Sequence, residues 1–228
     1  MSPKFQVFEQ FAALARVLGQ ANRLELLEHV AQGERPVERL AQLTGLSVAN
    51  ASQHLQVLRR AGFVRARRDG KQVLYRLGDG PVIELLAALR RYAEHSHAEL
   101  NAIVADYFRR LDSLEPVSRK ELVKRLKDKA VLLLDVRPED EFAQGHLPGA
   151  LNIPFAALGK ELSKLPKRAQ IIAYCRGPYC VLSFEAVAAL RAKGYDARRL
   201  EDGFPEWKAS GLPVGTARNG RQPSSRPS

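Results

Sequence analysis

Apolar residues recur at helical spacing through the first half of the chain. Before Gly19 they lie at intervals of three or four positions, at Phe5, Phe8, Phe11, Ala12, Ala15 and Leu18. This spacing predicts a first helix that ends at Gly19. The same pattern predicts helices over 21–30, 36–43 and 48–60, and then a long helix over 82–111.

The third and fourth predicted helices are joined by the short turn Thr44-Gly45-Leu46. Ser47 is placed to cap the fourth helix, whose inward face would carry Val48, Ala51, Leu55 and Leu58. Two helices joined by such a turn form a helix-turn-helix, whose second helix can lie in a DNA major groove.

Apolar and basic residues then alternate over 63–77, on both sides of Asp69-Gly70. Alternation with a period of two predicts paired strands, and Asp-Gly is a frequent two-residue hairpin turn. The hairpin would form a wing with arginines on its exposed face, where they can reach DNA phosphates.

The second half of the chain alternates short apolar runs with helical patterns. Runs over 130–135 and 169–174 predict buried strands, and helical patterns follow Ser118 and cover 181–193 before Gly194. This alternation predicts an α/β domain with a largely parallel sheet. The segment 113–117, which contains Pro116, predicts the domain boundary, and the Arg, Gly, Pro and Ser residues of 216–228 predict a disordered tail.

Charge changes this picture by pointing to a polyanion. The 228 residues carry a net charge of +11, and the densest basic stretch is 59–76, with seven basic residues and one acid. Such a cluster beside a helix-turn-helix indicates nucleic-acid binding. We expect DNA contacts from the outer face of the fourth helix and from the wing, at Ser47, Asn50, Ser52, Gln53, His54, Arg59, Arg65, Arg67, Arg68 and Lys71.

The chain begins MSPKFQ, without the apolar stretch of a signal peptide, and no segment approaches the roughly 18 apolar residues of a membrane span. We therefore expect a cytoplasmic protein without a membrane partner. Because cytoplasmic thiols are kept reduced, a cysteine pair there indicates catalysis or redox chemistry more than a structural bridge.

Both cysteines lie in one hexapeptide, Cys175-Arg176-Gly177-Pro178-Tyr179-Cys180, between a predicted strand and a predicted helix. Loop amides and the helix dipole favour an anion at Cys175, which predicts a lowered pKa and a reactive thiolate. Arg176 adds a positive charge. The alternatives are two packed core thiols and a metal pair, and no histidine lies nearby in sequence to complete a metal site.

The first half resembles the winged helix-turn-helix of the ArsR/SmtB family of repressors, through LGQANRLELLEHVAQGERPVERLAQLTGLSVANASQHLQVLRRAGFVRARRDGKQVLYRLGD. The resemblance implies a homodimer that pairs through the first helix and the long helix. An apolar stripe on the long helix would supply that contact, or would cover the domain's own core: Val82, Leu85, Leu86, Leu89, Tyr92, Leu100, Ile103, Val104, Tyr107 and Phe108. This half contains no cysteine, and His95 and His97 point to different helix faces, so we expect no metal switch and no cofactor.

The second half resembles the rhodanese domain, through LLLDVRPEDEFAQGHLPGALNIPF, the cysteine loop, and the closing segment from Glu201 to Val214. The resemblance implies that Cys175 accepts a sulfane sulfur as a persulfide, with Arg176 beside it and Gly177, Pro178 and Tyr179 cradling the anion. We expect Asp135 and Arg137 to brace the loop, His146 to orient a turn, and Trp207 to lie in the core.

One position departs from the rhodanese pattern. The loop ends in Cys180, where members that use thiosulfate more often carry Arg, Lys, Thr or Ser. A disulfide needs Cα atoms within about 7 Å, which a curled six-residue loop can allow. Cys180 could therefore resolve a persulfide or sulfenate on Cys175. It could equally be a packed thiol that never meets Cys175.

The sequence thus predicts two domains, a mainly α winged helix-turn-helix over 1–112 and an α/β rhodanese domain over 118–215. Together they suggest a homodimeric transcriptional repressor that binds double-stranded DNA and responds to reactive sulfur or an oxidant through Cys175. The partners would be DNA, a second copy of the chain and a persulfide, polysulfide or thiosulfate donor. The rival is a rhodanese-type sulfurtransferase whose DNA-binding half only localises it.

Overall fold

The computed structural model describes residues 1–108, 116–127 and 131–216. The backbone divides into two compact units, one over Met1–Leu85 and one that starts at Leu86. The first is a helical unit with a small antiparallel sheet and the second contains a parallel sheet, so the predicted fold class is confirmed. The predicted tail beyond Thr216 and residues 113–115 of the predicted linker lie outside the described residues.

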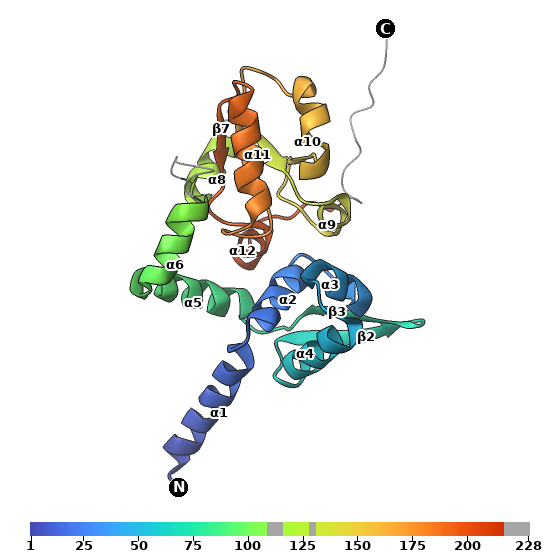
Figure 1. The fold of residues 1–228 in the computed structure, drawn as a ribbon, viewed down its shortest axis with the longest axis vertical. Helices are drawn as coiled ribbons and strands as arrows, with labels where there is room; N and C mark the ends of the chain where they lie inside the picture. Colours follow the sequence, from blue (N-terminus) through green and yellow to red (C-terminus); the bar gives the residue numbers. More distant parts are fainter. Residues whose placement is uncertain (109–115, 128–130, 217–228) are drawn as a thin grey trace. The chain divides into compact units, whose positions relative to one another are not determined.

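The first unit begins with four helices in the predicted order. They are α1 (Pro3–Leu18), α2 (Ala21–Ala31), α3 (Val37–Thr44) and α4 (Val48–Arg60). Gly45 ends α3 in the left-handed region at φ 65°, and the Ser47 hydroxyl accepts a hydrogen bond from the Asn50 amide at 3.2 Å. The helix-turn-helix therefore has the caps that its sequence predicts, and Figure 1 shows α1 projecting from the rest of this unit.

The inward face of α4 differs from the prediction at one position. Ala51, Leu55 and Leu58 are completely buried, but Val48 is 47% exposed. Val48 is the first residue of α4, and burial along this helix begins only at Ala51. The prediction was wrong for Val48 because periodicity does not show where a helix begins to meet its neighbours.

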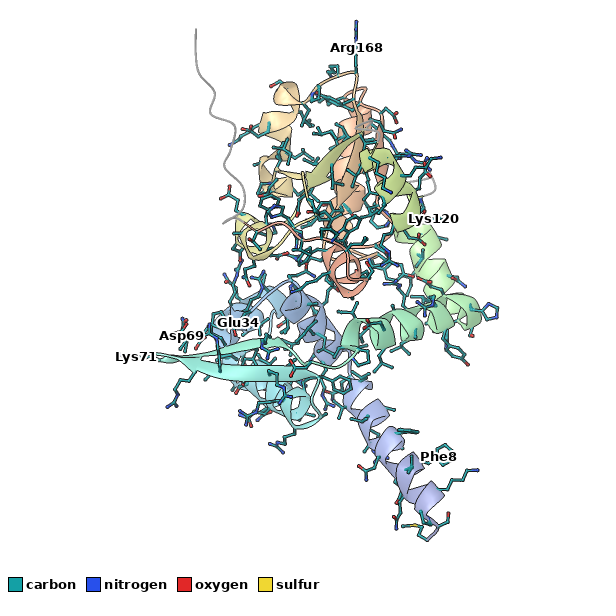
Figure 2. The ribbon with its side chains drawn as sticks, turned by 180° about the vertical axis from the view of Figure 1, so that it is seen from behind. Phe8, Glu34, Asp69, Lys71, Lys120 and Arg168 are labelled. Atoms are coloured by element: carbon teal, nitrogen blue, oxygen red, sulfur yellow. A yellow bond between two sulfur atoms is a disulfide. The ribbon has the colours of Figure 1, made fainter. Side chains whose placement is uncertain are left out.

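The wing is the hairpin of β2 (Val64–Asp69) and β3 (Gln72–Leu77), and β1 (Arg35–Pro36) pairs with the other edge of β3. Asp69 pairs with Gln72, so the two-residue turn is Gly70-Lys71 and not the predicted Asp69-Gly70. Gly70 takes φ 58°, the left-handed conformation that this turn requires. Figure 2 shows Asp69 and Lys71 at the tip of the hairpin.

The long helix predicted over 82–111 is broken. α5 (Val82–Ser96) ends before His97, whose extended backbone starts α6 (Ala98–Ile103), and a π-helical turn over Val104–Phe108 follows. Histidine and serine at positions 95–97 are weak helix formers, so the break falls where propensity is low. The Asn101 side-chain amide donates to the Glu94 carbonyl at 2.9 Å and satisfies an acceptor at the break. Residues 109–111 lie outside the described part of the chain.

The second unit contains a four-stranded parallel sheet in the order β5-β4-β6-β7. Its strands are β4 (Val131–Asp135), β5 (Leu151–Asn152), β6 (Gln170–Tyr174) and β7 (Ala197–Arg199). Its helices are α8 (Arg119–Lys127), α9 (Glu139–Gln144), α10 (Phe155–Glu161), the 3-10 turn η2 (Leu162–Lys164), α11 (Val181–Ala192) and α12 (Phe204–Ala209).

Both faces of this sheet are covered. Leu134 and Ala173 belong to a core shared with α10 and α11, whereas their neighbours Leu133 and Ile172 belong to a core shared with α8 and α12. Adjacent strand residues point to opposite faces, which explains the continuous apolar runs in β4 and β6. Trp207 lies in the second core, as predicted, and is 3% exposed. The elements can be followed in Figure 1.

Within the three described ranges, no helix combines the length and the apolar character that crossing a membrane would require.

Candidate functional site

The cysteine loop joins the carboxyl end of β6 to the start of α11. Cys175 follows Tyr174, the last residue of the strand, and Cys180 is the N-cap of the helix. Cys175 is 1% exposed and Cys180 is 7% exposed. A disulfide joins them, with their Cα atoms 6.1 Å apart, inside the usual range for such a bond. The loop therefore brings the two cysteines into direct contact.

Backbone contacts set the shape of the loop. The Cys180 amide donates to the Gly177 carbonyl at 3.1 Å, which closes a tight turn over Pro178 and Tyr179. The Arg199 guanidinium donates to the Pro178 carbonyl at 3.3 Å. These contacts fix the segment that the sequence assigned to cradling an anion, and that role stays a prediction.

The segment before α12 supports the loop from another side. The Phe204 amide donates to the Cys175 carbonyl at 3.1 Å. At Gly203 the approach is closer still, because a Cβ atom there would lie 2.3 Å from the Arg176 carbonyl carbon and 2.4 Å from the Gly177 nitrogen. Gly203 could not be recognised from the sequence, because a requirement for space between distant segments leaves no local pattern.

The positive charge of Arg176 is paired with a carboxylate. Its guanidinium makes three hydrogen bonds of 2.7–3.0 Å to the carboxylate of Glu141 on α9. Glu141 is completely buried, and this paired geometry holds the loop to α9. The pairing offsets much of the positive charge that Arg176 would otherwise present to a thiolate at Cys175.

Asp135 and Arg137, predicted to support the loop, form a completely buried ion pair at 2.6 Å. Burial alone would lower the pKa of Arg137, but the hydrogen bonds and charge of Asp135 raise it, so the guanidinium is charged. It lies 5.6 Å from the ring centroid of Tyr174 and 4.4 Å from that of Phe204. Tyr174 directly precedes Cys175, and the Phe204 amide donates to the Cys175 carbonyl. Arg137 therefore packs against two residues that adjoin the loop.

His146 directly precedes the turn over 147–150, which the Ala150 amide closes by donating to the Leu147 carbonyl at 3.1 Å, and its role in orienting that turn stays a prediction. Its ring stacks on Phe142 with centroids 3.8 Å apart, and Nδ1 is 2.9 Å from the Phe142 carbonyl oxygen. Its backbone exchanges two hydrogen bonds of 2.9 Å with Gly215. The ring therefore packs on α9, and the backbone of His146 holds the chain near Gly215 beside it.

Two residues of α5 contact this site, and both lie in the second unit. The Tyr179 hydroxyl donates to the Glu94 carboxylate at 2.5 Å. The Arg90 guanidinium lies 3.2 Å from the carboxylate of Glu206 on α12. Burial, followed by the Glu94 carboxylate, raises the pKa of Tyr179, so its hydroxyl stays protonated and can donate. Nothing in the sequence pattern indicates these contacts.

The candidate DNA surface is formed by α4 and the wing. On α4, Asn50, Gln53 and Arg59 are exposed, and Ser52 and His54 are half-buried. The Ser47 hydroxyl is engaged in the helix cap, and the Ser52 hydroxyl accepts a hydrogen bond from Gln56 at 3.4 Å. The structure thus places the predicted α4 residues on one helix, and their role in binding DNA stays a prediction.

Ion pairs hold several of the wing arginines. Arg67 makes hydrogen bonds of 2.5–2.9 Å to the Glu34 carboxylate, which raises its pKa, and lies 3.4 Å from Asp69. Arg65 and Arg76 both contact Asp79, at 3.1 and 2.9 Å. Arg68 and Lys71 are exposed, and within the described residues neither makes an ion pair. The sequence predicted the basic wing but not the acids that neutralise part of it.

Apolar side chains are exposed on α1 and α5. On α1 they are Phe5, Val7, Phe8, Phe11 and Leu14, with exposed fractions of 43–60%. On α5 they are Leu85, Leu89 and Tyr92, and Ile103 follows on α6. Figure 2 shows Phe8 on α1. Exposed apolar faces of this extent are typical of protein–protein contact.

The described ranges contain no group of three or more His, Cys, Asp and Glu side chains placed to hold a metal ion. His95 is exposed near the end of α5, and His97 is the N-cap of α6.

Comparison with known proteins matches each half to a different family. Residues 21–66 match the bacterial regulatory protein, arsR family, and residues 118–210 match the rhodanese-like domain. The chain is 41% identical over 212 residues to the HTH-type transcriptional regulator Rv0324 of Mycobacterium tuberculosis, which covers 92% of both chains.

Two further relatives each match one half. A sulfurtransferase of Allochromatium vinosum is 35% identical over 100 residues, which is 43% of this chain and 92% of that protein. A probable mercury resistance operon repressor of Streptomyces lividans is 37% identical over 90 residues, which is 40% of this chain and 72% of that protein.

Proposed function

Because this chain belongs to the ArsR family of bacterial regulatory proteins and carries a C-terminal rhodanese-like domain, we propose that it is a repressor controlled by sulfur chemistry at Cys175. The dithiol form binds its operator, and the Cys175–Cys180 disulfide form releases it. The observation that carries this proposal is the contact between the two cysteines in a loop whose usual end residue is not cysteine.

The chemistry needs a sulfane-sulfur donor, which is a persulfide or polysulfide. The Cys175 thiolate attacks the terminal sulfane sulfur of the donor R–S–SH, forms Cys175–S–SH and releases R–S⁻. The Cys180 thiolate then attacks Sγ of Cys175, which forms the disulfide and releases hydrosulfide, HS⁻. The sulfane sulfur is reduced to sulfide while the two thiols are oxidised, so electrons and atoms balance.

Burial of the two cysteines supports this route over repeated turnover with an external acceptor. Cys175 is 1% exposed, so only a small donor can approach it, whereas Cys180 is already in contact. An attack inside the loop is unimolecular and does not wait for a second substrate.

On the DNA side, we propose that α4 lies in the major groove and that the wing contacts phosphates. The relevant α4 residues are exposed or half-buried, and the wing carries Arg65, Arg67, Arg68 and Lys71. The name of the Streptomyces lividans relative supports a repressor over an activator.

The exposed apolar faces of α1 and α5 support a homodimer. Five exposed apolar side chains on one helix would be unfavourable in water, so we assign them to pairing with a second copy of the chain. Dimerisation places two copies of α4 at half-sites about one helical turn apart, roughly 34 Å. A change of a few ångströms in that spacing weakens binding, and a coupling of 1–3 kcal/mol corresponds to about 5- to 150-fold in affinity.

We also propose the domain limits predicted from the sequence: 1–112 for DNA binding and dimerisation, 113–117 as linker, and 118–215 for sulfur chemistry. The proposed location is the cytoplasm, and the proposed mechanism uses no cofactor and no metal.

A second candidate function is favoured by the sulfurtransferase relative of Allochromatium vinosum. In that case Cys175 would pass its sulfur to an external acceptor many times, and DNA affinity would not change. The two functions therefore differ in turnover and in the response of DNA binding.

The test titrates reduced protein with polysulfide while measuring operator DNA affinity at fixed salt, and mass spectrometry follows Cys175 and Cys180. DNA release in step with disulfide formation is the expected result. The Cys175→Ser/Cys180→Ser variant should bind DNA like reduced wild type and ignore polysulfide. Release of DNA by that variant, or sulfur loading of the wild type without release, contradicts the proposal.

A further inference from the structure

The two α5 residues that contact the cysteine-loop region lie one helical turn apart. Arg90 and Glu94 are separated by four positions, so they share a face of α5, and the Arg90 Nε is 3.8 Å from Glu94 Oε1. Their side chains are 22% and 40% exposed, so this face of α5 is partly buried. The apolar side chains of α5 lie on another face and are exposed to solvent. Both residues and both of their partners belong to the second unit.

Glu94 contacts the loop directly. Tyr179, which donates its hydroxyl to Glu94, is the residue before Cys180 and lies inside the ring that the disulfide closes. A bond between Cys175 and Cys180 restricts the backbone of the four residues between them. Opening that ring, or adding a sulfur atom to Cys175, changes the conformations open to Tyr179 and so the position of its hydroxyl.

Arg90 contacts the other end of the loop through α12. The Glu206 carboxylate that pairs with Arg90 also accepts a hydrogen bond from the Gly203 amide at 3.1 Å. Gly203 packs directly on the backbone of Arg176 and Gly177, and the next amide binds the Cys175 carbonyl. Burial raises the pKa of Glu206, and the Arg90 charge opposes that shift. The two α5 residues therefore hold both ends of the loop.

We propose that Arg90 and Glu94 transmit the state of the Cys175–Cys180 pair to α5. The link to DNA rests on the proposed function, but the effect on α5 does not. α5 is suited to the task because it starts at Val82 in the first unit, close after the wing strand β3, and continues into the second unit. Closing the disulfide fixes Tyr179 on Glu94 and stabilises the last turns of α5. Reducing it loosens them.

The experiment measures amide hydrogen exchange in peptides that span residues 86–96, in the full-length protein, with the cysteines either bonded or reduced. In wild type, reduction should speed exchange in this segment several-fold. In Glu94→Ala and in Arg90→Ala the difference between the two states should shrink to less than about twofold. Glu94→Gln keeps an oxygen that accepts the Tyr179 hydrogen bond, so it should preserve most of the wild-type response.

Matched controls lie on the same stretch of chain. Arg91→Ala removes the same charge from the exposed residue next to Arg90, and Glu99→Ala removes a carboxylate from the exposed start of α6. Both should respond like wild type. The inference is overturned if α5 exchange is the same in both cysteine states of wild type, or if Glu94→Ala and Arg90→Ala respond as fully as the controls.

Operator affinity measured on the same samples separates this inference from the proposed function. A response of α5 without a change in DNA affinity supports the transmitting contact and rejects the sulfur-controlled repressor. A change in DNA affinity that persists in Glu94→Ala and Arg90→Ala, with α5 exchange unaltered, keeps the repressor and rejects the contact.

Discussion

Gly203 shows how a single residue decides the geometry of the cysteine loop. Its φ of −104° is open to any amino acid, so backbone conformation does not require glycine here. Lack of space requires glycine at this position, because the backbone of Arg176 and Gly177 lies where a Cβ atom would be. The loop can lie flat against the start of α12 only because that side chain is missing.

Gly203→Ala should therefore push the cysteine loop away from α12. Overpacking of this kind costs about 1–3 kcal/mol, and the neighbouring atoms are backbone and cannot rotate away. We expect urea unfolding to show a loss of that size together with slower formation of the Cys175–Cys180 disulfide.

The matched control is Gly159→Ala in α10, where an added Cβ meets nothing within 4 Å. Alanine is a better helix former than glycine by roughly 1 kcal/mol, so this variant should be as stable as wild type or more so. If Gly203→Ala is as stable as this control, the cysteine loop can move away from α12 without a loss in the free energy of unfolding.

The wing is the element whose sequence is most easily misjudged. Seven basic residues in 59–76 predict strong phosphate binding, yet Arg65, Arg67 and Arg76 are held by acids. Glu34 lies in a different segment from Arg67, 33 positions away. These exposed pairs contribute little to stability, so we expect their main effect to be on the positive charge that the wing presents.

Glu34→Gln should strengthen DNA binding. It removes the carboxylate that holds the Arg67 guanidinium, which can then contact a phosphate. Each additional phosphate contact steepens the dependence of log affinity on log salt by about 0.9, and that slope is the measurement. Glu38→Gln on α3 makes the same charge change at an exposed position and should leave the slope nearly unchanged. Equal slopes in the two variants would show that releasing Arg67 from Glu34 adds no phosphate contact.

Elements with local signals were predictable from the sequence, and those set by distant contacts were not. Ser47 and Gly45 mark the ends of helices by their own chemistry, so α3 and α4 were found within a residue or two. The break at His97 was missed because apolar periodicity continues across it. The ion pairs of Arg176 with Glu141 and of Arg67 with Glu34 join segments more than 30 positions apart, and single-sequence patterns do not register such pairs.

The helix α1 supplies a test of the proposed dimer. Phe8 is 54% exposed and packs edge-on against Phe11, with ring centroids 6.3 Å apart. Phe8→Asp would bury a charge in the interface, so we expect dissociation to monomers at micromolar protein in sedimentation experiments. Gln6→Asp adds the same charge at an exposed position on the other side of α1 and should remain dimeric. If both variants dimerise equally, α1 is not part of the interface.

At the scale of the whole molecule, the question is whether sulfur leaves the protein once or many times. In a sulfurtransferase with repeated turnover, the cysteine persulfide persists until an external acceptor removes the sulfur. In this chain Cys180 is already in contact with Cys175, and Arg176 is hydrogen-bonded to Glu141. Under the proposed function, Cys180 therefore ends the reaction at Cys175 by closing the disulfide, and a chain with that disulfide has no thiolate left to accept sulfur.

We therefore predict a single turnover from thiosulfate to cyanide when no reductant is present. The Cys175 thiolate takes the sulfane sulfur and releases sulfite. Cyanide can then remove that sulfur as thiocyanate, but attack by Cys180 on Cys175 competes and closes the disulfide with release of hydrosulfide. Wild type should therefore produce at most about one thiocyanate per chain, because the intramolecular attack has a large effective concentration. Cys180→Ser removes the competing thiol and should continue to produce thiocyanate, while Cys175→Ser should produce none. Linear thiocyanate production by wild type over many equivalents would instead make the chain a sulfurtransferase that carries a DNA-binding domain.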